Sequence, residues 1–502
     1  MRTTLLREAS GWSAAILIAI ITTAQIASTV RSDLLFRDGD SLVVALFARS
    51  IADGAPFDWV MSSVLFVPEI IVFGALWMLG GLLSLDVNTL LTLNAIVNLT
   101  ALYGAIRFAA GRRTAGSAPV AWALIAMAVF CVVAVTETSG SRDALELASL
   151  LTTTTYYSAT VIALVLTAGL VRRAFDRDAP AGRFPICLGV VAAVSVLSNP
   201  LYAAWAAAPL AVILAIAAVY PVARARALPL LWALLGGTIA GWIARIPLSA
   251  WIANDGSEYA QPGLWPESAR YYGDLLGERL ATPLGWAGTL IVVALMIASF
   301  VISLRSASIG ARLLATAAWA VPLLVLVAMV VLGTHAARYL EPVVVVPVLG
   351  LVASPRVVRM PRRAAVWTSA AVSAALVVCA GLSVPRAAVA SQHPNDDLVC
   401  VNDWVSASGR TGAGQFWTVR LPKLHIDDAS QLVQVDHQLN AYAWLVNQSD
   451  FSVGEVTFLI EDAQSSPWEL GTNVLPVDVI DCGQYTIYDF GTQTLPLGPP
   501  RN

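Results

Sequence analysis

Residues 284–304 read LGWAGTLIVVALMIASFVISL, a run without a single charged side chain. A helix needs about 20 mostly apolar residues to cross a bilayer, so this run predicts a transmembrane helix. The whole 502-residue chain is 57% hydrophobic and 13% charged, whereas soluble proteins carry about 25% charged residues. We therefore expect a polytopic α-helical membrane protein. About eleven stretches qualify as spans: 11–30, 89–109, 119–136, 154–171, 184–199, 201–220, 228–248, 284–304, 311–332, 337–354 and 366–386.

The charge balance excludes some classes of partner. The chain has 30 Lys and Arg against 33 Asp and Glu, a net charge of −3, and Lys423 is its single lysine. Nucleic-acid binding needs a basic surface, so no nucleic-acid partner is expected. The sequence also lacks a GxxxxGK[ST] motif, which leaves ATP-driven transport without support.

Arginine positions predict the orientation of the spans. Cytoplasmic loops of membrane proteins are rich in Lys and Arg, and every arginine cluster falls on one side if the apolar stretch 64–83 does not cross. Residues 31–88 then form the first extracytoplasmic loop, with 64–83 lying in the membrane interface. The alternative is a twelfth span at 64–83. We expect a multi-pass protein of the plasma (bacterial cytoplasmic) membrane, with a cytoplasmic N-terminus and an extracytoplasmic C-terminal domain.

The composition changes near residue 388. Charged residues become frequent, and alternating apolar residues predict strands at 432–435, 442–446, 455–460 and 484–488. The sequence thus predicts a transmembrane domain over 1–388 and a soluble extracytoplasmic domain over 389–502, either α/β or β-rich. Cys400 and Cys482 lie near the two ends of that domain. An oxidising compartment favours a disulfide between them; the alternative is two unpaired thiols.

The first extracytoplasmic loop contains an acidic motif. Residues 37–41 read RDGDS, so Asp38 and Asp40 flank a glycine that permits a tight turn. Two such carboxylates can bind a divalent cation such as Mg²⁺, Mn²⁺ or Ca²⁺, or one of them can act as a general base. The alternative is structural, with Asp40 as the N-cap of a short amphipathic helix over 41–51.

The order of features in this loop resembles that of the GT-C glycosyltransferases, in particular the bacterial relatives of protein mannosyltransferases and aminoarabinose transferases. The acidic motif follows the first span, a surface helix and a glycine-proline turn come next, and Pro68 and Glu69 open a second surface helix. Those relatives often have His-Pro where this chain has Val67-Pro68. The resemblance implies a GT-C-like fold with catalytic Asp38 and Asp40 and with Glu69 at the substrate site.

Two later extracytoplasmic loops provide further candidates for substrate binding. GT-C enzymes often carry a second acid in the second loop, where Glu137 and Asp143 match, and Arg142 can bind a phosphate with two hydrogen bonds. In the long loop 249–283, Asp255 and Glu258 stand among tryptophans and tyrosines. This mixture suits a sugar, because aromatic rings stack on its apolar face. Ordinary solvated loops and an interfacial aromatic belt are the alternatives.

A late predicted span begins on the extracytoplasmic side with a polar segment. His335, Arg338 and Glu341 are three residues apart, which predicts one shared helix face. GT-C relatives often have an arginine-tyrosine pair followed by proline at this point, and Arg338, Tyr339 and Pro342 match. Arg338 is then expected to bind the phosphate of a lipid donor. The alternative is an arginine that extends to the membrane interface.

These features predict an integral membrane glycosyltransferase that moves a hexosyl or pentosyl group from a polyprenyl-phosphate donor to an extracytoplasmic glycan, lipid or protein acceptor. A transporter or flippase of lipid-linked glycans would instead place charges inside the spans. A non-catalytic membrane scaffold with a binding domain would tolerate replacement of Asp38 and Asp40. The acids gather in the extracytoplasmic loops, and this distribution favours the enzyme.

Overall fold

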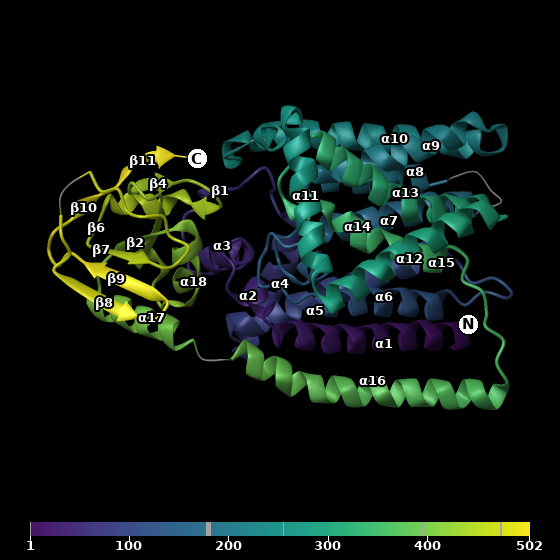
Figure 1. Ribbon diagram of the computed structural model, residues 1–502, viewed down its shortest axis with the longest axis horizontal. Helices are drawn as coiled ribbons and strands as arrows, with labels where there is room; N and C mark the ends of the chain where they lie inside the picture. Colours follow the sequence, from purple (N-terminus) through teal and green to yellow (C-terminus); the bar gives the residue numbers. More distant parts are fainter. Residues whose placement is uncertain (1, 177–181, 255, 393–394, 472–473, 502) are drawn as a thin grey trace. The chain divides into compact units, whose positions relative to one another are not determined.

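The computed structural model describes residues 2–176, 182–254, 256–392, 395–471 and 474–501 (Figure 1). The chain divides into two compact units. Unit 1 comprises Met1–Leu34, Thr92–Ile246 and Ser257–Ala390, and unit 2 comprises Leu35–Leu91, Pro247–Gly256 and Ser391–Asn502. The first loop therefore packs with the C-terminal region, whereas the sequence grouped it with the membrane domain.

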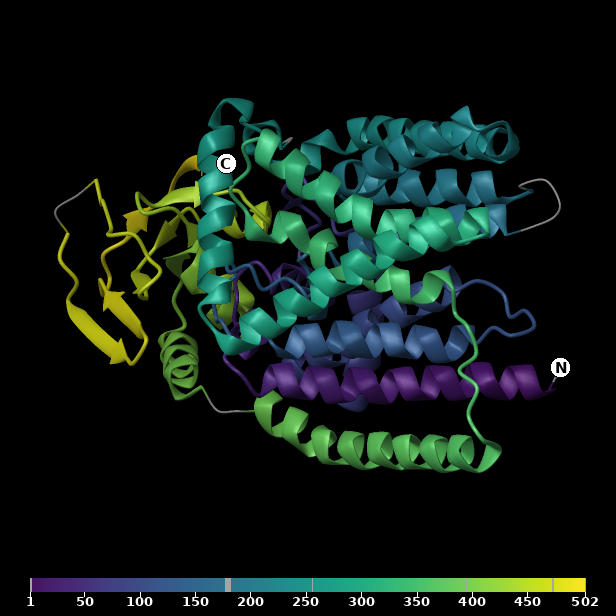
Figure 2. The same ribbon diagram turned by 45° about the vertical axis from the view of Figure 1, so that its right-hand side comes forward.

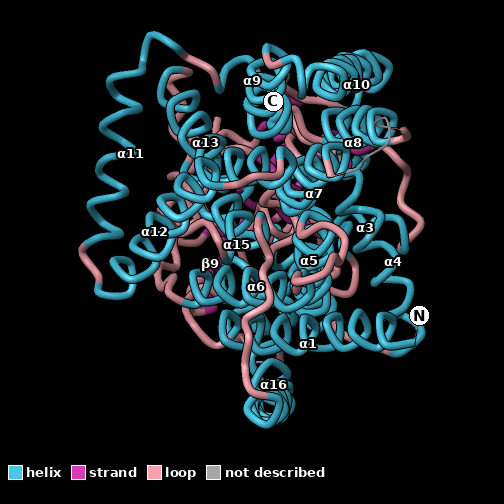
Figure 3. Tube along the Cα trace, turned by 90° about the vertical axis from the view of Figure 1, so that its right-hand side faces the viewer, coloured by secondary structure: helices cyan, strands magenta, loops and turns pink. Residues whose placement is uncertain are grey.

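Unit 1 is a bundle of helices (Figure 2). In the described part of the chain, seven helices are long and apolar enough to cross a membrane, as expected of a multi-pass membrane protein. They are α1 (Arg2–Ala27), α5 (Val87–Ala109), α7 (Ser158–Phe175), α10 (Pro221–Arg245), α12 (Pro283–Arg305), α13 (Ile309–Val331) and α16 (Arg362–Ser391). Helix α16 lies next to α1 in Figures 1 and 3.

The other four predicted spans are also helical, but their helices are shorter or irregular. They are α6 (Pro119–Val135), α8 (Phe184–Ser198), η2 with α9 (Ala203–Ala207 and Ala208–Val219), and the series η6 (Ala337–Leu340), α14 (Glu341–Val345), η7 (Val346–Val348) and α15 (Leu349–Ala353). Length and composition qualify seven helices, so the number of eleven crossings remains a prediction. The remaining helical segments of unit 1 are η1 (Ser149–Thr152), η4 (Ser257–Tyr259), η5 (Pro262–Leu264) and α11 (Trp265–Leu280).

Glycines allow two helices of the bundle to approach closely. Helices α8 and α10 share the most extensive packing in unit 1. A Cβ atom added to Gly237 would lie 2.2 Å from the carbonyl oxygen of Gly189, and one added to Gly241 would lie 2.6 Å from that of Ala193. Small residues at such crossings are typical of packed membrane helices, because van der Waals contact between backbones drives their association.

The first loop folds into three helices and a short strand: α2 (Ser32–Phe36), α3 (Val43–Ala52), β1 (Trp59–Val60) and α4 (Val67–Leu83). The last three of these elements lie in unit 2. Helices α3 and α4 occupy the two predicted surface segments, and the membrane position of α4 remains a prediction. The alternative that Asp40 caps the first of them is wrong. The N-cap residue of α3 is Leu42, which makes no side-chain cap hydrogen bond.

The C-terminal region builds a seven-stranded mixed sheet with the order β11-β4-β3-β2-β7-β9-β8. Central β2 pairs in parallel with both β3 and β7. The strands are β2 (Gly412–Gln415), β3 (Leu432–Val435), β4 (Asn440–Tyr442), β7 (Phe458–Glu461), β8 (Asp478–Cys482), β9 (Tyr485–Asp489) and β11 (Gly498–Arg501). The region also contains α17 (Asp396–Ser408), α18 (Phe416–His425), η8 (Ala429–Gln431), β5 (Val446–Asn447), η9 (Gln448–Val453), β6 (Glu455–Val456) and β10 (Leu495–Pro496).

Alternating side chains give this sheet two apolar faces, as the period of a strand requires. Leu432 and Phe458 join one core, with residues of α17 and α18, whereas Val433 and Leu459 join the other. Gly412 is required in β2, because a Cβ there would lie 2.1 Å from the Phe458 ring. The region is thus a mixed sheet with two helices, which agrees with the predicted α/β or β-rich domain.

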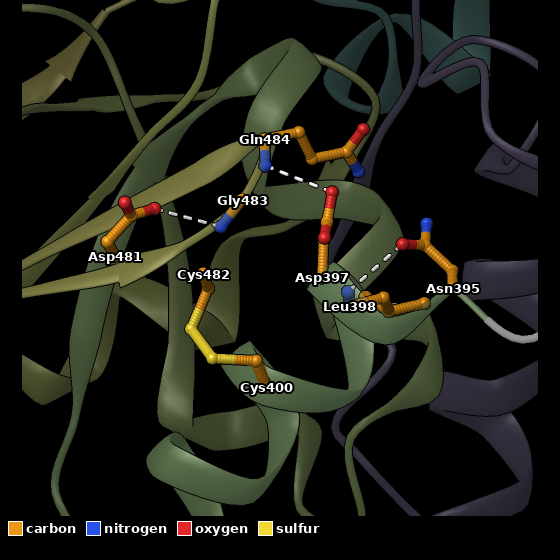
Figure 4. The surroundings of a disulfide bond; sticks show 8 residues. All are labelled: Asn395, Asp397, Leu398, Cys400, Asp481, Cys482, Gly483 and Gln484. Atoms are coloured by element: carbon orange, nitrogen blue, oxygen red, sulfur yellow. Dashed lines mark hydrogen bonds between the residues drawn. A yellow bond between two sulfur atoms is a disulfide. The ribbon is translucent and has the colours of Figure 1, made fainter.

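A disulfide joins Cys400 on α17 to Cys482 at the end of β8, with Cα atoms 5.6 Å apart (Figure 4). Close by, the Asp397 carboxylate accepts a hydrogen bond of 3.0 Å from the Gln484 amide. The bond confirms the predicted pairing and closes most of the C-terminal region into one loop.

The first loop and the C-terminal region are joined by backbone pairing and by an asparagine. Strand β1 pairs antiparallel with β5, and Trp59 lies opposite Asn447. The Asn447 amide donates to Ser50 Oγ at 3.0 Å and to the Pro56 carbonyl at 2.7 Å. Unit 2 also includes η3 (Ile246–Trp251) for most of its length, and the Met61 amide donates to the Trp251 carbonyl at 2.7 Å.

Lys423 holds a corner of unit 2 together from α18. Its ammonium donates to the carbonyls of Ala429 and Leu432 at 2.9 and 2.7 Å. It also lies 3.0 Å from Asp450, whose side chain is 15% exposed. Three partners match the three donors of an ammonium group.

Candidate functional site

The acidic loop is built onto helix α18. Asp38 accepts hydrogen bonds from the backbone amide and the hydroxyl of Ser41, at 3.0 and 3.1 Å. Asp38 therefore closes the turn before α3, whereas the capping alternative gave the role to Asp40. Gly39 faces α18, because a Cβ there would lie 3.0 Å from Trp417 Cε3. Asp38 is 9% exposed, and Asp40 is more exposed than Asp38.

A buried arginine fixes this loop from the other side. Arg420 is 1% exposed, and its Nη1 donates to the Gly39 carbonyl at 2.9 Å. Its Nε donates to Gln434 at 3.0 Å, and its guanidinium carbon lies 3.8 Å from the centroid of the Phe416 ring. The other terminal nitrogen donates to the carbonyls of Trp444 and Leu445. Arg420 thus fixes the backbone between the two aspartates.

The charges of this cluster act on each other. Burial lowers the pKa of Arg420 to about 10, and the charges of Asp40, Tyr442 and Asp38 oppose that shift. Tyr442 itself has a raised pKa because of burial, and Arg420 opposes the shift. Arg420 stays protonated at neutral pH, so the acidic loop has a fixed positive charge beside it.

The residues of the loop are a weak fit to the predicted divalent cation. The loop offers two carboxylates, and that of Asp38 already accepts hydrogen bonds from Ser41. The guanidinium of Arg420 stands beside them and repels a cation. The described residues hold no group of three or more His, Cys, Asp or Glu side chains suited to a metal. A cation would have to take most of its oxygen ligands from water or substrate.

Glu69, another acid that the sequence predicted at the site, has different surroundings from the acidic loop. Glu69 lies in the first turn of α4 and is 7% exposed. The chain enters α4 through Phe66, which has a φ of 51°, a conformation rare for a bulky residue. Asp255 lies outside the described residues.

In unit 1 the second predicted loop is organised by Arg31, which is 1% exposed. Its guanidinium donates hydrogen bonds of 2.6–3.1 Å to oxygen atoms of Ser139, Ser141, Glu146 and Ser149. Its Nη2 lies 3.8 Å from the Glu137 carboxylate. The loop therefore wraps around one buried cation.

Glu137 completes this network. Its carboxylate accepts hydrogen bonds of 2.7 Å from the amides of Ala148 and Ser149. Burial raises the pKa of Glu137, and Arg31, Arg279 and Ser149 oppose that shift. Glu137 is 2% exposed, and these hydrogen bonds stabilise the loop around it. Its role in substrate binding stays a prediction.

Arg338 lies among tyrosines. Its Nε donates to the hydroxyl of Tyr157 at 3.3 Å, and its guanidinium carbon lies 5.8 and 6.0 Å from the rings of Tyr156 and Tyr339. Trp205 fixes the backbone at Tyr339, because its indole N–H donates a hydrogen bond to the Tyr339 carbonyl at 2.9 Å. Tyr156 and Tyr157 are 2% and 8% exposed, so both rings lie inside unit 1.

Two features mark this cluster as more than a packed interior. Tyr157 has a φ of 63°, and such strain gathers at functional sites. Glu341 is 1% exposed, and its Oε1 atom has no hydrogen-bond partner in the described structure. Arg338 and Glu137 are its charged neighbours. A buried carboxylate with an unsatisfied oxygen is costly, which favours a ligand or a proton at this point.

The predicted shared helix face includes Arg338 and Glu341 but not His335. Segment η6 begins at Ala337, and Ala336 is extended (φ −139°, ψ 112°), so His335 lies before the helix. Its ring is exposed and 5.5 Å from that of Tyr271. The predicted helix face is therefore wrong for His335, because the helix starts two residues later than the spacing required. Its role in substrate binding stays a prediction.

The remaining candidates lie at the edge of this cluster. Asp143 is within 4.0 Å of Arg142. Burial raises the pKa of Tyr271 on α11, and the charge of Asp143 adds to the shift. Asp143 therefore belongs to the same surroundings as Arg338. Glu258 is exposed on η4.

Comparison with known proteins adds no assignment at this point. No protein-family model matches the chain, and no curated protein does.

Proposed function

We propose that the chain is a GT-C-type glycosyltransferase that uses a polyprenyl-phosphate sugar donor and an extracytoplasmic glycan, lipid or protein acceptor at the plasma membrane. The observation that carries the proposal is the Arg338 cluster, where one guanidinium stands among the hydroxyl-bearing rings of Tyr156, Tyr157 and Tyr339. A guanidinium and phenol groups are suitable partners for phosphate oxygens.

The proposed reaction is the displacement of a lipid phosphate at the anomeric carbon. The oxygen of the acceptor hydroxyl forms a bond to that carbon while the bond from the carbon to the phosphate oxygen breaks. The acceptor proton passes to a carboxylate, and the polyprenyl phosphate leaves with the bonding electron pair. Arg338 stabilises the charge that develops on the leaving phosphate.

The two aspartates of the acidic loop have separate roles in this scheme. Asp38 shapes the turn through Ser41, so we assign it as a positioning residue. Asp40 is the more exposed of the two and is assigned as the general base. Arg420 keeps the backbone between them in place.

The test is sugar transfer in membranes that contain the full chain, with a panel of synthetic polyprenyl-phosphate hexoses and pentoses. Asp40→Asn and Arg338→Gln are each expected to lower the rate by about 100-fold or more, the size of loss typical of a removed base or charge stabiliser. Asp58→Asn, in the same loop, and Arg270→Gln, on α11, are the controls, because both side chains are exposed. Full activity in Asp40→Asn would overturn the base assignment. Transfer of a lipid-linked glycan across vesicles without chemistry would favour a flippase.

A further inference from the structure

Unit 1 contains a second polar site at the opposite end of helix α7 from Tyr157. A pocket of about 890 Å³ is lined by five arginines from separate parts of the chain, Arg112, Arg172, Arg173, Arg226 and Arg356. Helix α7 has 18 residues, which corresponds to a length of roughly 27 Å. The pocket is therefore separate from the Arg338 cluster.

The lining of this pocket is strongly positive. Among its described lining residues the single acid is Asp176, which accepts a hydrogen bond of 3.0 Å from Arg172. Five arginines against one aspartate leave a formal charge of +4. Concentrating like charges around one hollow costs free energy through repulsion unless an anion offsets it.

Several of these arginines are fixed by the fold. Arg172 is 6% exposed, and its Nη1 donates to the carbonyls of Ala109 and Val352 at 2.6 Å. Arg173 donates to the Phe108 carbonyl at 2.8 Å, and Arg226 donates to the Phe175 carbonyl at 3.2 Å. Each guanidinium has five N–H donors, so Arg173 and Arg226 retain further donors for a ligand.

Membrane orientation alone does not account for this arrangement. Arginines orient a membrane protein through the number of them in the short loops near the ends of the spans. For that purpose each side chain can point into water by itself. Here arginines of the 110–117 loop, α7, α10 and the segment after α15 converge on one pocket. Arg113 and Arg359, by contrast, are exposed neighbours outside its lining.

We infer that this pocket binds a phosphate-bearing anion with more than one negative charge. One guanidinium group can donate two parallel hydrogen bonds to the oxygens of one phosphate group. Several arginines together favour a pyrophosphate or a phosphomonoester over a monoanion. Such a group is present both in soluble phosphates and in the head group of an anionic lipid. The inference is independent of the proposed transferase activity.

The experiment compares two charge-matched double variants of the full-length protein, purified in a zwitterionic detergent. Arg112→Gln with Arg356→Gln removes two exposed arginines of the pocket, and Arg113→Gln with Arg359→Gln removes their neighbours. Both pairs remove the same charge from the same loops, so any effect on membrane orientation is matched. The probes are inorganic pyrophosphate, measured by calorimetry, and phosphatidic acid against phosphatidylcholine, measured by native mass spectrometry.

The pocket variant is expected to bind the anionic probe about tenfold more weakly or worse, which corresponds to about 1.4 kcal/mol, whereas the neighbour variant keeps the wild-type affinity. This pattern with pyrophosphate identifies a soluble phosphate ligand, and the pattern with phosphatidic acid alone identifies a lipid head group. The inference is overturned if the wild type binds neither probe, or if the two variants lose affinity equally.

Discussion

The Nη1 atom of Arg420 donates a hydrogen bond of 2.9 Å to the carbonyl oxygen of Gly39, the residue between Asp38 and Asp40. The two residues are 381 positions apart, yet both belong to unit 2. The C-terminal region therefore shapes the loop that we propose to be catalytic. A binding domain attached only through its linker would have no such role.

Replacing Arg420 is expected to destabilise unit 2. Arg420→Met leaves the carbonyls of Gly39, Trp444 and Leu445 without this donor, and an unmet buried acceptor costs about 1–3 kcal/mol. Faster hydrogen exchange at residues 37–41 and a lower melting temperature would show the effect. Arg410→Met is the control, because Arg410 pairs with Asp489 at a more exposed position and should cost about 1 kcal/mol or less.

Gly39→Ala tests the close approach of the loop to α18. The added Cβ would lie 3.0 Å from Trp417 and 3.5 Å from Arg420 Cδ, so the aspartates must shift by a few tenths of an ångström or more. We expect kcat to fall about tenfold with little change in KM, because small misplacements at a reacting centre are expensive. Gly74→Ala, which would meet no atom within 4 Å, should leave the rate unchanged. An unchanged kcat in Gly39→Ala would contradict the role of the loop.

Arg31 is predicted to be the side chain on which the conformation of the second loop depends most. Arg31→Met removes the ion-pair partner of the buried Glu137 and leaves Arg279 as its second positive neighbour. Breaking a buried pair costs about 3–5 kcal/mol. Thermal denaturation in detergent should show the loss. Adding Glu137→Gln to this variant should restore part of the stability, since it removes the orphaned charge. If the double variant is no more stable than Arg31→Met, the pairing is not the source of the effect.

Reduction of the disulfide is expected to loosen the C-terminal region. Cys400 and Cys482 are separated by 82 residues, and closing a loop of that size stabilises a fold by about 4 kcal/mol in the chain-entropy model. Cys400→Ser with Cys482→Ser should therefore raise the rate of cleavage by thermolysin within residues 395–501. Cys187→Ser, which removes a free thiol, should behave like the wild type.

The stability of unit 2 is expected to fall in mild acid because of His425. Burial lowers the pKa of His425 to about 4, and the charge of Arg49 adds to the shift. The unfolded chain has an ordinary pKa near 6.5 for histidine and takes up a proton first as the pH falls. The stabilisation is complete above about pH 6.5 and is lost as the pH drops towards 4, up to about 3 kcal/mol. Denaturation of wild type and His425→Gln at pH 7.5 and 4.5 measures it, and equal losses in both proteins would refute the assignment.

Much of the helical architecture follows from the sequence, because an apolar run of span length has few other folds available to it. The strands were harder to predict. Leu432–Val435 alternates and was predicted, but central Gly412–Gln415 has two glycines and no alternation. Its strand is determined by packing against Phe458, which is distant in sequence. The predicted strand 442–446 is interrupted, because β4 ends at Tyr442, Leu445 has a φ of 52° and β5 begins at Val446.

The candidate site could be predicted only in part. Asp38, Asp40 and Arg338 were identified by their position after or before a span. Arg31 and Arg420 were not, because a single arginine in a sequence gives no sign of being buried among carbonyl oxygens. Burial of this kind depends on contacts between segments more than 100 residues apart.

The Lys423 corner has a practical consequence for chemical labelling. The chain has one side-chain amine, and in the folded state it is held by Asp450 and two carbonyls. A reagent that acylates amines thus has a single side-chain target, and the reaction rate at Lys423 reports the opening of α18 away from its neighbours. One mass shift on one peptide then follows the unfolding of unit 2 in a native membrane.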